Sequence, residues 1–314
     1  QFARHFLNPL IAAKYFSLRT DSVFLRSVDG LCPEEIYRMA GWWLRLSPSF
    51  LPLISVPTWA SGLTKRFVTR DPRVGTEKEA KFILRTLFKQ LRRTLVALKP
   101  KSSRSRWTGY QQSEISYGDH QKATKARFVR QFLERANAAH VLDVGCNSGH
   151  YSLLAATSGA KVVALDSDPA CIDELSRRAK VMKLDILPLC LNICSPSPAM
   201  GWRYGQATSF IDRASGRFDA VFALAVMHHM VSQHQVPIPQ ILSLFAEFTK
   251  RDLIFEFIGP EDPLFKQMTW GRDYLRLSRE SFEAFAKESF EVVESVGVPE
   301  SDRTLYHLRK RGNS

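Results

Sequence analysis

The segment VLDVGCNSGHY, residues Val141–Tyr151, is the most informative part of the chain. An apolar run ends at Val144 and meets a turn whose glycines, Gly145 and Gly149, stand four residues apart. Glycine is needed where a backbone turns sharply or approaches a ligand closely. The residues after the turn fit a helix, whose amino end would offer free N–H groups to a ligand. We therefore predict a strand, a ligand-binding turn and a helix.

The rest of the chain beyond this turn alternates apolar strands with helical segments. We expect further strands at Val162–Leu165, Ile186–Leu191, Ala220–Val226, Leu253–Ile258, Glu291–Val298 and Thr304–Arg309. Helices are expected between them, at Ser148–Ala156, Pro169–Met182, Ile238–Lys250 and Ser281–Ser289. This alternation indicates an α/β fold, a parallel sheet with helices on both faces. The last two strands, joined by a short turn, indicate an antiparallel hairpin at one edge.

Two acidic residues indicate what the turn binds. The second strand leads to Asp166, 23 residues after Asp143, and an acidic residue there is placed to accept hydrogen bonds from ribose hydroxyls. The dinucleotide pattern G-x-G-x-x-G is absent, because Asn147 stands two residues after Gly145. Asp143 would meet a pyrophosphate unfavourably and suits the α-amino group of a cationic ligand better. The ligand predicted is therefore a nucleoside that is not a dinucleotide.

With these features in register, residues 119–314 resemble a class I S-adenosylmethionine-dependent methyltransferase. The resemblance implies a Rossmann-like seven-stranded sheet and S-adenosylmethionine as the cofactor. The cofactor-binding residues that it implies are Asp143, Gly145, Cys146, Asn147, Gly149, Asp166, Ser167, Asn192 and Ala223. Asn147 stands where many members have glycine, and Asn192 where many have an acidic residue. The amide of Asn192 can still accept a hydrogen bond from adenine, but it adds no charge.

Three residues are candidates for catalysis. His228 and His229 follow the fourth strand, where the resembled fold faces the methyl acceptor, and a neutral imidazole is a suitable base. The alternative is that one histidine caps the strand and the other packs. Glu256 lies inside the apolar strand LIFEF, where a carboxylate needs a partner; it either faces the pocket or pairs with a basic residue such as Arg272. No metal site is expected, because no carboxylate completes a set with His228, His229 and His234.

The net charge of +13 is concentrated in the first part of the chain. Residues 1–118 hold 20 Lys/Arg against 8 Asp/Glu, and residues 119–314 hold 24 against 23. The densest segment, 65–106, contains a predicted amphipathic helix at Glu77–Leu98. This segment is a possible site for an anionic partner, such as a nucleic acid or a membrane surface. The alternative is a packed helix with a solvated basic face.

The region before this helix is expected to be helical but irregular, with one helix from Pro33 to about Leu46. A second resemblance covers most of the chain, through Gln1–Leu10, Ser195–Trp202, Ala223–His229 and Asp302–Tyr306. These segments resemble a group of bacterial methyltransferase-like proteins, some of them linked to rhizobial nodulation. Members carry a longer N-terminal part similar to a kinase lobe. The resemblance implies that residues 1–64 end such a lobe, residues 65–118 hold the basic helix and a linker, and residues 119–314 form the methyltransferase domain.

Composition limits the class of protein. No apolar run has the roughly 18–20 residues of a membrane span, and five irregularly spaced cysteines favour a reducing cytoplasm. Because the first residue is Gln1, we expect a processed product or a fragment. The leading hypothesis is methyl transfer to an O or N nucleophile of an unknown acceptor, a small molecule or saccharide rather than nucleic acid. The alternatives are an RNA-associated methyltransferase or binder that uses the 65–106 segment, and an inactive cofactor-binding module.

Overall fold

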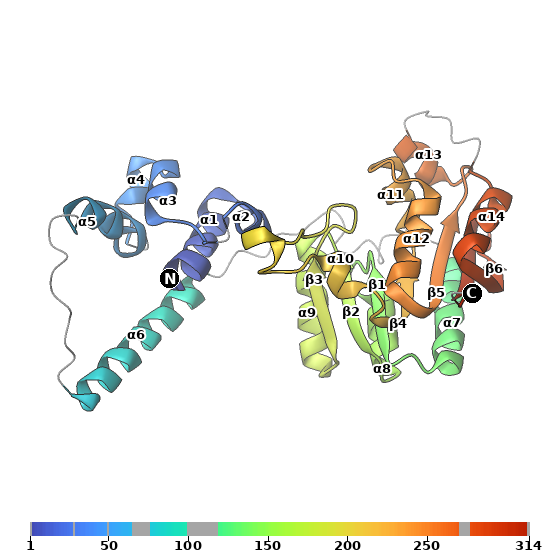
Figure 1. The fold of residues 1–314 in the computed structure, drawn as a ribbon, viewed down its shortest axis with the longest axis horizontal. Helices are drawn as coiled ribbons and strands as arrows, with labels where there is room; N and C mark the ends of the chain where they lie inside the picture. The colour runs from blue at the N-terminus through green and yellow to red at the C-terminus, as the bar shows by residue number, and fades with distance from the viewer. Residues whose placement is uncertain are drawn as a thin grey trace. The chain divides into compact units, whose positions relative to one another are not determined.

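A computed structural model describes residues 2–27, 29–48, 50–64, 76–98, 119–269 and 277–312. The chain forms two compact units, Gln1–Ser102 and Ser103–Ser314, and each is treated by itself (Figure 1). Arg272, the loop at 270–274 and the linker at 99–105 lie outside the described residues. Within the described ranges, no helix is both long and apolar enough to cross a membrane.

The first unit consists of helices around a small core. Its helices are a π-helix at Ala3–Leu7, α1 at Asn8–Phe16, α2 at Thr20–Arg26, α3 at Pro33–Met39, α4 at Trp42–Arg45, a second π-helix at Leu51–Ser55, α5 at Val56–Thr64 and α6 at Glu77–Ala97. The single helix expected from Pro33 to about Leu46 is wrong. It is interrupted because Ala40 and Gly41 are extended, with ψ angles of 132° and 158°. The buried core is Leu7, Ile11, Ile36, Ala40, Phe50, Ile54 and Leu98.

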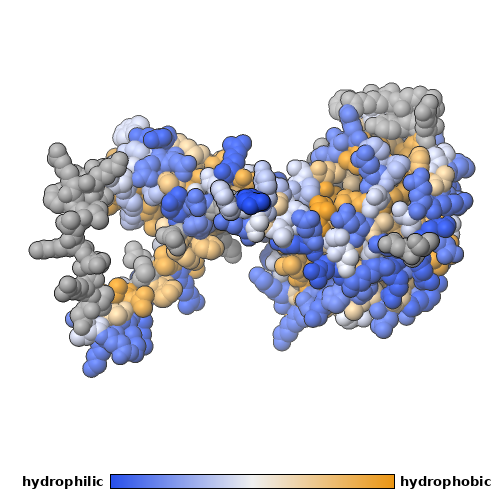
Figure 2. Space-filling view, in the orientation of Figure 1, coloured by the Kyte–Doolittle hydropathy of each residue, from blue (hydrophilic) through white to orange (hydrophobic). Residues whose placement is uncertain are grey.

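Among the described residues, the basic helix α6 packs against the core at its carboxyl end. Thr76 caps it, because the Thr76 hydroxyl accepts from the Glu79 amide and the Glu79 carboxylate accepts from the Thr76 amide. Leu98 is buried in the core, whereas Phe82 and Phe88 are 72% and 66% exposed. Figure 2 shows apolar side chains on the surface of α6 next to hydrophilic ones. Within the described part of the chain, the alternative of a packed helix therefore applies to the last turns of α6, and its other turns are exposed.

The second unit is built on a seven-stranded sheet. Its strands are β1 at His140–Val144, β2 at Lys161–Asp166, β3 at Ile186–Cys190, β4 at Phe218–Ala223, β5 at Thr249–Ile258, β6 at Phe290–Gly297 and β7 at Arg303–Lys310. Their order is β3-β2-β1-β4-β5-β7-β6. Strands β1 to β5 are parallel, and β7 is antiparallel to both β5 and β6. The predicted α/β fold class with its antiparallel end is confirmed.

Helices cover both faces of this sheet (Figure 1). The first face packs against α7 at Asp119–Ala136, α8 at His150–Thr157 and α9 at Pro169–Met182, and the second against α12 at Ile238–Phe248 and α14 at Arg279–Ser289. Side chains alternate along β4, because successive residues of a strand point to opposite faces. Ala220 and Phe222 join the core of the first face, and Val221 and Ala223 that of the second.

The carboxyl end of β4 comes earlier than the sequence predicts. The strand stops at Ala223 rather than Val226, because Ala225 has a φ of 53°, which an extended strand cannot accept.

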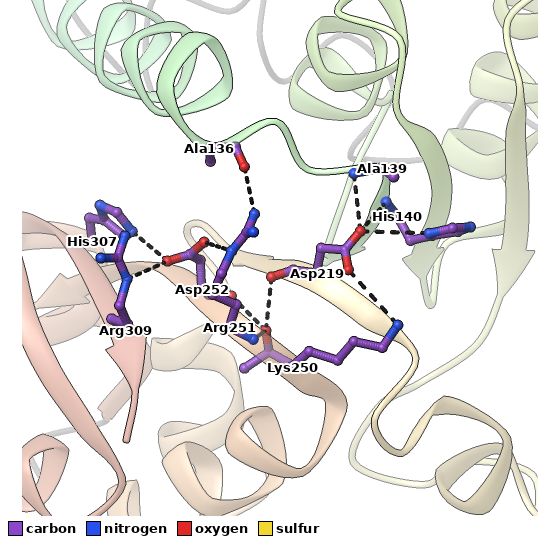
Figure 3. Close-up of polar contacts among 10 residues, drawn as sticks. Ala136, Ala139, His140, Asp219, Lys250, Arg251, Asp252, His307 and Arg309 are labelled. Atoms are coloured by element: carbon purple, nitrogen blue, oxygen red, sulfur yellow. Dashed lines mark hydrogen bonds and ion pairs between the residues drawn. The ribbon is translucent and has the colours of Figure 1, made fainter. Parts of the chain in front are cut away.

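At the amino ends of β1, β4 and β5, carboxylates join the strands (Figure 3). Asp219 accepts hydrogen bonds from the amides of Ala139 and His140 at 3.0 and 2.9 Å. These contacts leave the opposite, carboxyl ends of the strands available for a site.

The neighbouring strand contributes a buried carboxylate to the same end of the sheet. Asp252, on β5, lies 2.9 Å from His307 Nε2 and 2.8 Å from Arg251 Nε (Figure 3). Arg251 also donates to the Ala136 carbonyl at the end of α7. This network therefore ties β5, β7 and α7 together at the end of the sheet away from the glycine turn.

Candidate functional site

The glycine turn lies at the point where the order of the strands reverses. From β1 the chain moves outward to β2 and β3, and then returns to place β4 on the other side of β1. In open parallel sheets, ligands bind outside the carboxyl ends of the strands at such a point. The turn joins β1 to α8 at this end of the sheet.

Hydrogen bonds hold the turn against the end of β2. The amides of Gly145 and Cys146 donate to the Leu165 carbonyl at 2.8 and 2.9 Å. The Asn147 amide donates to Asp166 Oδ2 at 2.8 Å. Gly145 has a φ of 74° and Asn147 a φ of 50°, and asparagine tolerates this left-handed region better than most residues. The turn is thus fixed beside the acidic end of β2.

A cavity of about 480 Å³ opens next to this turn, within the range of small-molecule sites. It is lined by the turn, by residues after β2, β3 and β4, by α7, and by α11 at Met227–Ser232. The predicted site residues that line it are Gly145, Cys146, Asn147, Asp166, Ser167, Asn192, His228, His229 and Glu256. The sheet therefore brings these predicted residues from five separate segments to one cavity.

Three predicted cofactor residues do not line this cavity. Asp143 is buried on β1 and accepts a hydrogen bond from Ser152 Oγ at 2.5 Å; burial raises the pKa of Asp143 to about 6. Gly149 caps α8 with a φ of 83°, and a Cβ there would lie 2.2 Å from Leu175 Cδ1. Ala223 is buried in β4. These residues form the structure beneath the turn.

Two polar side chains near the turn can still accept a hydrogen bond from a ligand. Asp166 Oδ1 accepts from the Asp168 amide at 2.9 Å and Oδ2 from the Asn147 amide. Burial raises the pKa of Asp166, although these backbone bonds oppose the shift. Asn192 Oδ1 accepts from the Cys194 amide at 2.9 Å. Carboxylate and amide oxygens each have further lone pairs, so both side chains can accept another hydrogen bond from the cavity.

The two histidines lie together at the start of α11, with ring centroids 4.1 Å apart. His228 is 4% exposed, and its Nδ1 atom has no hydrogen-bond partner among the described residues. Burial lowers the pKa of His228 well below its usual value, and the charges of Arg303 and Lys125 act in the same direction. Burial also lowers the pKa of His229, partly offset by a hydrogen bond with Gln233. His228 is therefore a neutral imidazole at neutral pH.

Glu256 both lines the cavity and has basic partners. Its Oε1 atom lies 2.5 Å from Lys125 Nζ and 3.2 Å from Arg303 Nη1. Arg303 Nε contacts Asp262 Oδ2 at 2.6 Å. All four side chains are buried. Glu256 Oε2 has no partner within the described part of the chain, so this buried charge cluster presents one unpaired acceptor atom.

The sequence analysis missed Lys125 and Arg303. A signal for Lys125 was present, because Phe128 and Phe132 follow it three and seven residues later on α7. That spacing puts Lys125 in the apolar stripe of its helix, where a lysine needs a buried partner. Among the described residues, no group of three or more His, Cys, Asp or Glu side chains could hold a metal ion.

Comparisons with known proteins bear on this site. A family model described as a methyltransferase domain matches residues 117–285, which is more than half of the chain. Nodulation protein NoeA of Rhizobium meliloti (strain 1021) is 27% identical over 317 residues, covering 99% of this chain. The bifunctional methyltransferase/kinase WbdD of Escherichia coli is 29% identical over 136 residues, 42% of this chain. The chain spans 65% of the length of NoeA and 16% of that of WbdD.

Among solved structures, the N-methyltransferase NodS from Bradyrhizobium japonicum WM9, in complex with S-adenosyl-L-homocysteine, is similar. It is 16% identical, with a TM-score of 0.48, and the match covers 63% of this chain and 91% of NodS. The family match extends over the sheet, the glycine turn and the cavity described above. As the resemblance to S-adenosylmethionine-dependent methyltransferases predicts, the chain belongs to the methyltransferase domain family.

Proposed function

We propose that this protein transfers a methyl group from S-adenosylmethionine to an O or N nucleophile of a small or saccharide-like acceptor. The observation that carries the proposal is the cavity in which the glycine turn, Asp166 and His228 meet. We place the reaction in the cytoplasm, because the five cysteines are free thiols, as expected in a reducing compartment.

The residues of the cavity fit this cofactor. Asp166 and Asn192 offer acceptor oxygens for ribose hydroxyls and for the adenine amino group. Leu165, Leu191 and Ile193 supply apolar surface in the same wall, which suits a nucleobase. Gly145 lets the turn pass close to Val226, because a Cβ at Gly145 would lie 3.0 Å from Val226 Cγ2. These groups would therefore hold the nucleoside part of the cofactor at the ends of β2 and β3.

The histidines would act on the acceptor rather than on the cofactor. When bound, S-adenosylmethionine supplies a methyl group that is already activated, so the chain mainly contributes positioning and proton removal. His228 Nδ1 would accept a proton from an acceptor hydroxyl, because its imidazole is neutral and this atom has no other partner among the described residues. An amine acceptor that arrives unprotonated needs no base.

Calorimetric titration of S-adenosylhomocysteine into the full chain tests the cofactor. We expect micromolar binding that Asp166→Ala abolishes or greatly weakens and Asp166→Asn weakens less, because the amide keeps an acceptor oxygen. Asp173→Ala is the matched control, since Asp173 is exposed on α9. Thermal unfolding of each variant would separate lost binding from lost folding. Absence of binding to folded wild-type protein would reject the proposal.

Measuring turnover tests whether His228 is the base. It also distinguishes an enzyme from an inactive cofactor-binding module. Labelled S-adenosylmethionine would be incubated with a small-molecule extract of bacterial cells, as the acceptor source. We expect His228→Gln to bind S-adenosylhomocysteine like the wild type but to lose about 100-fold in turnover, the usual effect of removing a general base. Equal turnover in the variant would assign the proton transfer elsewhere.

A second candidate function is binding of an anionic partner by α6. The basic side chains Lys78, Lys81, Arg85, Lys89, Arg92 and Arg93 are all exposed, next to the exposed Phe82 and Phe88. Binding of anionic lipid vesicles and of RNA would be measured at increasing salt, which weakens such contacts. We expect Arg85→Glu with Lys89→Glu to lose binding, and the exposed pair Lys180→Glu with Lys183→Glu on α9 and its C-cap to retain it.

A further inference from the structure

The apolar stripe of α6 is covered over its last turns and open before them. Leu84, Phe88, Leu91, Leu95 and Leu98 stand three or four residues apart, which puts them on one side of the helix. Leu98 belongs to the core of the first unit, and Leu91 and Leu95 pack against it. Leu84 and Phe88 continue the stripe toward the amino end, but they are 50% and 66% exposed. Among the described residues, this part of the stripe is therefore open to a partner.

The exposed turns of α6 are held as a helix by contacts at both ends. At the carboxyl end, Lys14 on α1 donates a hydrogen bond to the Ala97 carbonyl at 2.7 Å, next to the packed turns (Figure 1). At the amino end, Thr76 and Glu79 form the capping box described above. A partner would therefore meet a helix that is already formed, and binding would not have to order it.

A row of basic side chains runs beside the open part of the stripe. Lys81, Arg85, Lys89 and Arg92 are also three or four residues apart, and all four are exposed. Lys81 pairs with the exposed Glu77 at 2.6 Å. The helix holds six basic residues and two acidic ones, and both acids lie in its first turn. The exposed turns therefore join an apolar surface to a cationic one.

This combination fits an anionic membrane surface. Helices that lie in a membrane interface carry Lys and Arg on one face and Leu or Phe on the other. The apolar side chains enter the boundary of the acyl chains, while the cations stay at the lipid phosphates. In α6, Arg85 directly follows Leu84 and Lys89 directly follows Phe88. The basic row therefore lies next to the stripe and does not interrupt it.

Two other partners fit this surface less well. An RNA would meet the basic row through its phosphates, but the exposed Ile83 and Leu84 have no ring on which a base could stack. A second copy of the chain could cover the stripe, but it would bring the same excess of cations to the interface, where like charges repel. Of the three partners, only the lipid surface uses both the stripe and the basic row.

We propose that α6 lies in the interface of an anionic bilayer, with Leu84 and Phe88 at the acyl chains and Arg85 and Lys89 at the lipid phosphates. This inference rests on the second candidate function proposed above, the binding of an anionic partner by α6, and names that partner. It does not depend on the methyl transfer, because α6 belongs to the first unit and the cavity to the second.

Sedimentation of the full chain with sucrose-loaded vesicles tests the inference. One set of vesicles consists of phosphatidylcholine alone, and the other also contains phosphatidylglycerol. We expect binding to the anionic vesicles and weaker binding to the neutral ones. Added salt should reduce the binding without abolishing it, because salt screens charges but not apolar contacts. No binding to the anionic vesicles, or equal binding to both sets, overturns the inference.

The decisive variant is Leu84→Gln with Phe88→Gln, and Val181→Gln with Met182→Gln is its matched control. Both pairs are exposed apolar side chains on a helix, but the control pair lies on α9 of the second unit. Glutamine keeps the helix, because its helix propensity is close to that of leucine. We expect the stripe variant to bind anionic vesicles at least about 10-fold more weakly, the effect of no longer burying one such side chain. Wild-type binding by this variant overturns the inference.

A charge variant tests the basic row. Arg85→Gln with Lys89→Gln should weaken the binding of anionic vesicles about 25-fold, because each Lys or Arg near an anionic leaflet contributes about a factor of 5. The control is Lys180→Gln with Lys183→Gln, an exposed pair at the end of α9. Equal losses in the two pairs would mean that net charge alone attracts the chain to the vesicles, and would overturn the inference.

Three further measurements separate the possible outcomes. RNA binding that depends on Arg85 and Lys89, without vesicle binding, would support an anionic partner but overturn the bilayer. In sedimentation velocity, a wild-type dimer that becomes a monomer in the stripe variant would assign the stripe to a second copy and overturn the inference. Titration of S-adenosylhomocysteine reports on the methyl transfer alone, and we expect it to be unchanged. If circular dichroism shows that the stripe variant has lost its helix, Phe88→Gln alone repeats the test with the same expected loss.

Discussion

The two ends of α8 offer a direct measure of why the turn needs glycine at position 149. Gly149 caps the amino end with a φ of 83°, and Gly159 follows the carboxyl end with a φ of 96°. A Cβ at Gly149 would lie 2.2 Å from Leu175 Cδ1, whereas a Cβ at Gly159 would meet nothing within 4 Å. Alanine at either position adopts a left-handed backbone, but only Gly149→Ala also forces a packed side chain to move.

These differences allow the loss in free energy of unfolding to be worked out for each glycine. A left-handed conformation costs a residue with a side chain about 1–2 kcal/mol, and overpacking a core adds about 1–3 kcal/mol. We therefore expect Gly159→Ala to lower the free energy of unfolding by about 1–2 kcal/mol. Gly149→Ala should lower it by about 2–5 kcal/mol. The larger loss is a considerable part of the usual total of about 5–15 kcal/mol.

The assay is urea denaturation, monitored by far-ultraviolet circular dichroism. No variant changes a residue of the first unit. Adding Leu175→Ala to Gly149→Ala removes the clashing atoms, so the double variant should lose less than the sum of its single losses, by about 1–3 kcal/mol. Leu175→Ala paired with Gly159→Ala should be additive. Equal losses at the two glycines, or no coupling with Leu175, would refute this account of the turn.

Three further predictions concern buried polar groups and one cap. Asp143→Asn should raise the free energy of unfolding by about 3 kcal/mol above pH 6 and change it little near pH 4. The reason is that burial raises the pKa of Asp143 to about 6, and the protonated acid resembles the amide. Urea midpoints at both pH values check this. Asp252→Asn should lose about 1–3 kcal/mol at neutral pH. Burial would raise the pKa of Asp252, but bonds from His307 and Arg251 keep it below its usual value. The stability that ionised Asp252 contributes is therefore fully present above the ordinary carboxylate pKa. Urea titrations should show this contribution shrinking as the pH falls through the lowered pKa. Thr76→Ala should lower the helical signal of α6 and cost about 1 kcal/mol. Circular dichroism and thermal unfolding would measure this loss against Thr208→Ala, because Thr208 is exposed and lies outside any helix.

The end of β4 shows where a pattern in sequence stops being informative. The run FALAV is apolar throughout, and it predicts a strand to Val226. The chain turns at Ala225 instead, with a φ of 53°, and Val226 packs beside Gly145, where a Cβ would lie 3.0 Å from Val226 Cγ2. The turn after β1 therefore sets the end of β4, and that neighbour is 81 residues away in the chain.

The partner of Glu256 is a second example. A carboxylate within LIFEF predicts a basic partner, and the sequence offered Arg272, which lies outside the described residues. The partners in the structure are Lys125 and Arg303. Arg303 reaches Glu256 because β7 inserts antiparallel beside β5, a pairing that depends on the order of the strands. Local patterns specify that a partner is needed, not which element brings it.

The sequence by itself determined the parallel sheet, the glycine turn, the acidic end of β2 and the family of the chain, because periodicity and turn residues act over a few neighbours. Only the tertiary structure decided that Asp143, Gly149 and Ala223 support the turn from beneath. It also decided that Glu256 and His228 line one cavity. The physical reason is that burial and the pairing of charges depend on which elements the sheet brings together, and residues far apart in the chain carry no local sign of that contact.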